Sequence, residues 1–163
     1  MNNIEKYFNQ EKFQCTIAIV ISIVLISVSV YLLLSKATLL QKGFAYVSLP
    51  LSFLLLVICT SVVIKTPKDI VRITTYYNTE PQKILDNEIP RMNQVMNSFK
   101  TTKKLEFIFI IVGVCLLIFF WRTGLVSGIG FALLFHGFLM FFFDYFAEQR
   151  GEEYLNFLNS IKK

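Results

Sequence analysis

The chain has 163 residues, which is the size of one compact unit, and its composition excludes an ordinary soluble domain. Hydrophobic residues make up 55%, against roughly 45–50% in soluble domains, and phenylalanine alone occurs 17 times. The net charge of +5 would suit a nucleic-acid partner, but the distribution of the basic residues indicates membrane topology instead, so we expect no nucleic-acid binding.

Four apolar segments are predicted to cross a membrane as helices. They are about 15–35, 43–64, 105–121 and 124–146. A helix needs roughly 17–25 mainly apolar residues to cross the hydrocarbon core, and each segment falls in that range. The expected fold is therefore an all-α integral membrane protein, with four transmembrane helices forming two antiparallel hairpins in a single domain, 1–163.

Lysine and arginine residues lie mostly on one side of these segments. The N-terminal flank carries two, the loop 65–104 eight and the C-terminal tail three, which is thirteen in all, whereas the two short loops carry three. Cytoplasmic loops are enriched in Lys and Arg. The sequence therefore predicts a multi-pass protein of a cytoplasmic (inner) membrane, with both termini in the cytoplasm.

Residues 1–14 precede the first apolar segment and are predicted to form a short helix in the membrane interface. Ile4, Tyr7 and Phe8 recur there at helical spacing, with polar residues between them.

The loop 65–104 is long enough to carry helices of its own. Helix-start signals with a proline in the first turn stand at Thr66-Pro67, Thr79-Glu80-Pro81 and Pro90. No helix breaker follows Pro90, so the sequence predicts one helix from about 90 to 121 whose first half lies in the cytoplasm. The fourth segment is likewise expected to continue as a cytoplasmic C-terminal helix, 147–163.

Both cytoplasmic extensions carry an apolar stripe at helical spacing. The stripe residues are Met92, Val95, Met96 and Phe99 in the first, and Tyr154, Phe157 and Leu158 in the second. We expect the two stripes to pack against each other, although they would equally serve as an interaction face for a partner.

Small residues recur along the fourth apolar segment. They include Gly124, Gly128, Gly130, Ala132 and Gly137. Helices in lipid associate where small residues allow close approach. These residues therefore predict a helix-packing face, used either within the hairpin with the third segment, where Gly113 is the only glycine, or in an oligomer.

His136 is the only histidine and lies deep in the fourth segment. An ionisable residue inside a membrane is a candidate functional group, here a proton relay or a pore-lining residue. The alternative is a neutral imidazole that hydrogen-bonds another helix. Its candidate partners at similar depth are Ser22, Ser27, Ser52 and Cys115.

Two carboxyl groups stand at the ends of apolar segments, Glu106 at the start of the third and Asp144 near the end of the fourth. In an antiparallel hairpin these ends meet, so Asp144 and Glu148 are expected near Lys103 and Lys104. A functional role would require Glu106, Asp144 and His136 to converge on one path.

No catalytic motif is present, and a single histidine with unpaired cysteines leaves no set of metal ligands. Cys15, Cys59 and Cys115 are expected to be packing residues. We therefore expect no enzyme activity, no cofactor and no small-molecule substrate.

The sequence predicts a non-enzymatic membrane protein that acts through helix–helix interaction with itself or with a membrane partner. An immunity-type protein or an accessory subunit of a larger complex would fit, since many unrelated small membrane proteins share this topology. The alternative is an oligomeric ion channel or proton-coupled transporter with His136 and Asp144 on the pathway.

Overall fold

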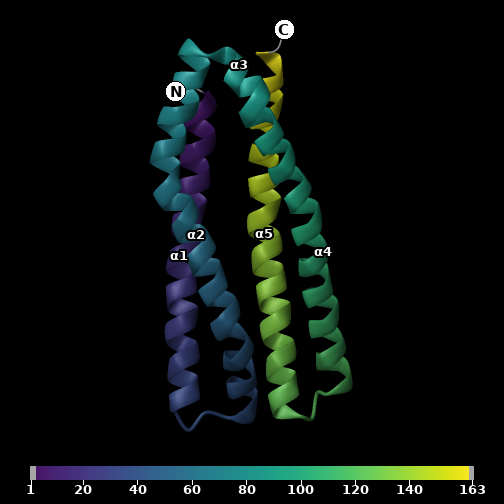
Figure 1. The fold of residues 1–163 in the computed structure, drawn as a ribbon. Coiled ribbons are helices and arrows are strands. Elements are labelled where there is room, and N and C mark those ends of the chain that lie inside the picture. The colour runs from purple at the N-terminus through teal and green to yellow at the C-terminus, as the bar shows by residue number, and fades with distance from the viewer. Residues whose placement is uncertain (1–2, 162–163) are drawn as a thin grey trace.

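The computed structural model describes residues 3–161, which contain helices and no strand, so the all-α prediction is confirmed. Four long helices form the molecule, as Figure 1 shows. They are α1 (Asn3–Leu34), α2 (Leu39–Thr79), α4 (Ile89–Phe119) and α5 (Gly124–Ser160). A short helix, α3 (Pro81–Lys83), and a π-helical turn, η1 (Ile84–Glu88), connect α2 to α4.

By length and composition, α1, α2 and α5 are able to cross a membrane. The helix α4 is not among them, so the expected set of four spans is supported for three helices only. The apolar part of α4 follows directly on Lys103 and Lys104 and ends with the helix at Phe119. It is thus shorter than the roughly 17–25 residues that a span requires.

The main contacts between the helices follow the sequence α1–α2–α5–α4: α1 lies along α2, α2 contacts α5, and α5 lies along α4. In Figure 1 the short connections 35–38 and 120–123 lie at one end, and α3, the start of α1 and the end of α5 lie at the other. The first connection ends in a capping box, in which Thr38 N–H donates to Gln41 Oε1 (2.9 Å) and Gln41 N–H donates to Thr38 Oγ1 (3.4 Å).

The prediction of a separate interfacial helix at residues 1–14 was wrong. The helix α1 begins at Asn3 and continues without a break into the first apolar segment. Ile4 and Phe8 are buried in a core at the end of the bundle that holds α3 (Figure 1). Their helical spacing does form one apolar face, but other helices of the chain cover it.

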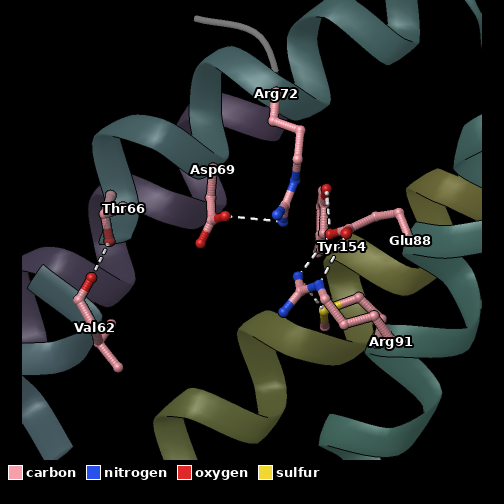
Figure 2. Close-up of polar contacts among 8 residues, drawn as sticks. Val62, Thr66, Asp69, Arg72, Glu88, Arg91 and Tyr154 are labelled. Carbon is pink, nitrogen blue, oxygen red and sulfur yellow. Dashed lines mark hydrogen bonds and ion pairs between the residues drawn. The ribbon is translucent and has the colours of Figure 1, made fainter. Parts of the chain in front are cut away.

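The prediction of a helix start at Thr66-Pro67 was also wrong, because α2 runs on through Pro67. Pro67 has no N–H to donate to the preceding turn. The Thr66 hydroxyl donates to the carbonyl of Val62 (2.8 Å), as Figure 2 shows. The other two signals lie at real boundaries, since α3 begins at Pro81 and α4 begins at Ile89, one residue before Pro90.

A compact core lies at the end of the bundle that holds α3 (Figure 1), which we call the α3 end. Its buried residues are Ile4, Phe8, Ile73, Ile84, Met92, Tyr154 and Leu158. They come from α1, α2, η1, α4 and α5, so every long helix contributes to this core. Within residues 3–161 the opposite half has no comparable cluster of large buried side chains, and its helices meet instead at small residues.

Candidate functional site

The glycines of α5 bring its backbone into direct contact with α2. A Cβ on Gly128 would stand 2.0 Å from the carbonyl oxygen of Leu40, and one on Gly43 would stand 2.1 Å from that of Leu125. Only glycine fits at these two points, which is the arrangement expected where two membrane helices approach closely. Gly43 was not singled out from the sequence, because one glycine in an apolar run shows no period.

Other small residues of α5 face α4. A Cβ on Gly130 would lie 3.0 Å from the carbonyl oxygen of Gly113, and one on Gly137 would lie 2.8 Å from Ile110 Cγ1. Ala132 is fully buried, whereas Gly124 is less confined, its nearest neighbour being Leu39 Cβ at 3.3 Å. The small residues of α5 therefore serve two neighbours within the chain, and little of this face is left for an oligomer.

His136 is fully buried at 0% exposure between α5 and α2. Its Nδ1 lies 3.0 Å from the carbonyl oxygen of Ala132, and its Nε2 lies 3.1 Å from Ser52 Oγ. A carbonyl only accepts, so Nδ1 carries a proton, and Nε2 of the neutral ring then accepts from the Ser52 hydroxyl. Both ring nitrogens thus have partners, and Ser52 is one of the four that the sequence proposed.

Glu106 and Asp144 lie together where α4 meets α5. Glu106 is 1% exposed, and neither of its carboxyl oxygens has a hydrogen-bond partner within residues 3–161. Lys103 forms its ion pair with Glu148 rather than with Asp144. These two carboxyl groups therefore converge, but His136 faces α2 and does not join them.

The apolar stripes expected on the two helix extensions lie inside the molecule. Met92 and Leu158 are fully buried and Tyr154 nearly so, while Val95, Met96, Phe99 and Phe157 are partly buried. Met96 Sδ would be 2.9 Å from a Cβ on Gly151, so the α4 stripe rests directly on α5. Of the two uses expected for these residues, the structure has packing within the chain.

A charged cluster, which the sequence did not reveal, lies at the α3 end. Glu88, at 2% exposure, accepts two hydrogen bonds from Arg91, at 2.8 Å from Nε and 2.6 Å from Nη2, and a third from the Tyr154 hydroxyl at 3.2 Å. In Figure 2 this group faces Asp69 and Arg72 of α2, which form a second ion pair of 2.8 Å. The hydrogen bonds to Glu88 raise the pKa of Arg91, and burial raises the pKa of Tyr154, so Arg91 stays charged and Tyr154 neutral.

Beside this cluster, a cavity of about 240 Å³ lies between α1, α2 and α4. We call it the charged cavity. Four charged residues line it, namely Glu11, Lys65, Asp69 and Arg91, together with Tyr7, Thr66 and apolar side chains. It lies at the level where the apolar runs of α1 and α2 end, since Lys65 directly follows the segment 43–64.

A larger, apolar groove opens between α1 and α5. The two helices are in contact where Tyr7 stacks on Tyr154, with ring centroids 4.3 Å apart, and where Gln14 Nε2 donates to the Phe143 carbonyl at 2.6 Å. Beside these contacts lies a space of about 630 Å³, the α1–α5 groove, which extends from Asn9 to Ile21 on α1 and from Leu139 to Arg150 on α5. Its walls include Phe13, Ile17, Leu139, Phe142 and Phe146.

The polar end of the groove is closed by Arg150, whose guanidinium donates to Glu11 (2.8 Å from Nη2) and to the side-chain carbonyl of Gln14. The charge of Arg150 is thus compensated by Glu11, and the remaining surface of the groove is almost entirely apolar. Such a surface suits an apolar occupant.

No group of three or more His, Cys, Asp or Glu side chains within residues 3–161 is placed to hold a metal ion. Compared with known protein families, curated proteins and solved structures, the chain matches none of them. The groove, the cavity and the buried polar groups are therefore the features that bear on its function.

Proposed function

We propose that this chain is a non-enzymatic, multi-pass protein of a cytoplasmic membrane that binds a transmembrane helix of a partner protein in the α1–α5 groove. The groove itself is the observation that carries the proposal. It lies between two helices that are able to cross a membrane, and its walls are phenylalanine, leucine and isoleucine side chains. Large exposed apolar surfaces that are hollowed in this way are typical of interaction sites.

The groove is favoured over the two interaction faces that the sequence indicated, because both are already used within the chain. The small residues of α5 contact α2 and α4, and the apolar stripes of the helix extensions pack in the core at the α3 end. A partner helix in the groove would pack its side chains between those of Phe13 and Phe142, which are 70% and 60% exposed. In lipid such packing is a principal driving force for helix association.

The proposed topology places the core at the α3 end, the charged cluster and both chain ends on the inner, cytoplasmic side of the membrane. The thirteen basic residues on that side support this orientation. In this arrangement α4, together with the residues that follow it up to Trp121, forms the fourth and shortest span, with the ion pair of Lys103 and Glu148 at the membrane boundary. An immunity-type protein that binds a membrane-active toxin and an accessory subunit of a membrane complex are two forms of this proposal.

Replacing Phe142 with a photoreactive phenylalanine analogue tests the proposal. Irradiation of membranes is expected to give one discrete protein adduct, because Phe142 lines the groove. Phe53 on α2 is the matched control, since it has the same 60% exposure but does not line the groove. Gel electrophoresis and mass spectrometry of the adduct measure the result.

An adduct of the mass of two chains would identify the occupant as a second copy and overturn the proposal of a different partner. Adducts of equal yield at Phe142 and Phe53, or lipid adducts alone at Phe142, would overturn the groove as a protein-binding site.

A proton-coupled transporter is the second candidate, and the buried Glu106 carboxyl group beside Asp144 favours it. His136 would have to lie on the same path, yet it is bonded to Ser52 and Ala132 on another side of α5. The groove supports the binding function better, because it provides an open surface and the carboxyl pair does not.

His136→Leu is therefore expected to leave proton flux into liposomes unchanged. The lost hydrogen bond to Ser52 should lower the free energy of unfolding by about 0.6 kcal/mol, the average for such bonds between membrane helices, and by at most about 1.7 kcal/mol. Flux measured with a pH-sensitive dye and unfolding in mixed micelles check the two parts. A flux in the unsubstituted protein that His136→Leu abolishes would instead establish the transporter.

A further inference from the structure

The charged cavity carries one positive charge that the protein does not balance. Three of its four charged residues have an ion-pair partner: Glu11 pairs with Arg150 (2.8 Å), Asp69 with Arg72 (2.8 Å) and Arg91 with Glu88 (2.6 Å). Lys65 has no carboxylate within 4 Å among residues 3–161. The net charge around the cavity is therefore +1, which suits a ligand group with one negative charge.

The cavity also has hydrogen-bond donors to spare. Arg91 uses Nε and Nη2 for Glu88 and leaves Nη1 without a partner within the described residues. The ammonium group of Lys65 adds three N–H donors, and the Tyr7 hydroxyl adds one O–H donor. An oxyanion accepts strong, charge-assisted hydrogen bonds from such groups.

The position and the remaining walls limit what the anion is attached to. Val62 belongs to the last turn of the apolar segment of α2, and Phe8 and Val95 add apolar surface beside it. A volume of about 240 Å³ is too small for a whole phospholipid but is large enough for a phosphate group and the carbon atoms next to it.

We propose that the charged cavity binds the phosphodiester of an anionic phospholipid from the cytoplasmic leaflet, with Lys65 and Arg91 as its donors. A phosphodiester carries one negative charge, its oxygens match the two basic groups, and its glycerol carbons match the apolar side of the cavity. The inference rests on the proposed membrane insertion, but not on a partner in the α1–α5 groove, because the groove and the cavity share no lining residue.

Lipid binding by the full chain in a mild detergent tests the inference, with native mass spectrometry as the readout. The probes are dioleoyl phosphatidylglycerol and, separately, inorganic phosphate as its competitor. The variant is Lys65→Gln. Its matched control is Lys68→Gln, a lysine of the same helix that is exposed, as Lys65 is, but does not line the cavity. Lys65→Arg retains the charge and serves as the conservative variant.

One tightly bound phosphatidylglycerol is expected for the unsubstituted protein. Lys65→Gln should weaken its binding by about tenfold, because one charge-assisted hydrogen bond is lost. Lys68→Gln should change it by less than about twofold, and Lys65→Arg should retain most of it. Inorganic phosphate is expected to displace the lipid poorly, since it lacks the apolar contacts.

Several results would overturn the inference. The first is no retained lipid, and the second is an equal loss in Lys65→Gln and Lys68→Gln, which would indicate a general basic surface. Inorganic phosphate that binds as well as the lipid would assign the cavity to a free anion instead. The Phe142 crosslink, measured in Lys65→Gln, separates the two proposals: a crosslink that persists without lipid binding overturns only this one.

Discussion

Gly128→Ala is expected to lower the free energy of unfolding by about 3 kcal/mol, at the upper end of the usual cost of overpacking. The added methyl group would lie 2.0 Å from the carbonyl oxygen of Leu40 and 2.8 Å from the backbone nitrogen of Phe44. Ordinary contact begins at 3.4 Å, so α2 and α5 would have to separate by more than an ångström. Neither neighbour is a flexible side chain that is able to turn aside.

Gly124→Ala is the matched control, because it adds the same methyl group to the same helix. Its nearest contacts would be Leu39 Cβ at 3.3 Å and Leu40 N at 3.4 Å, which a shift of a few tenths of an ångström relieves. Gly124 is the first residue of α5, so alanine gains less there than its advantage of about 0.8–1.0 kcal/mol over glycine in a helix interior, but this gain offsets the small contact cost, and we expect no net destabilisation.

Unfolding in mixed micelles, followed by circular dichroism, measures both variants and also Gly43→Ala. Gly43 meets α5 at the same crossing, so Gly43→Ala combined with Gly128→Ala should cost less than the sum of the two, since one helix separation relieves both clashes. Equal stability of Gly128→Ala and Gly124→Ala would show that α2 and α5 are not in backbone contact there.

These glycines also show which helix contacts can be predicted from the sequence and which cannot. The spacing of small residues predicted a packing face on α5, because the period of a helix is present in the sequence itself. It did not predict Gly43, whose role depends on which residue of α5 lies opposite. The division of the stripe between α2 and α4 depends on the packing order of the helices, which no local pattern encodes.

The helix boundaries were predictable where the chain turns and unpredictable where it continues. Glu80-Pro81 marks a real break, whereas Thr66-Pro67 carries a similar signal inside α2. The packing of Ile73 in the core at the α3 end favours the continuation of α2 through Pro67, and this contact joins residues far apart in the sequence. Glu88 was missed for a related reason: an acid in a polar loop has no distinctive pattern until the fold buries it beside Arg91.

Arg91→Ala is expected to lower the free energy of unfolding by about 3 kcal/mol. It removes the two hydrogen bonds that the guanidinium donates to Glu88 and leaves the Glu88 carboxylate, at 2% exposure, with the Tyr154 hydroxyl as its remaining partner. Breaking a buried ion pair in this way costs about 3–5 kcal/mol. The lower value applies because the Arg91 side chain is itself 37% exposed.

Arg72→Ala is the matched control, since Arg72 forms the same kind of pair with Asp69, also three residues away. This pair lies at 46% and 25% side-chain exposure, so water replaces the lost partner and the cost should stay within about 1 kcal/mol. Figure 2 shows the two pairs side by side at the end of the bundle, where they differ mainly in burial.

Glu88→Gln in the Arg91→Ala background tests whether the unpaired charge of Glu88 causes the loss of stability. If the unpaired charge is responsible, the neutral amide should recover a large part of the lost stability, because a buried neutral group costs less than a buried charge. No recovery would assign the loss to the packing of the Arg91 side chain. Because Arg91 also lines the charged cavity, phosphatidylglycerol binding by the double variant should fall even where its stability returns, which separates the structural role of this arginine from its role as a lipid ligand.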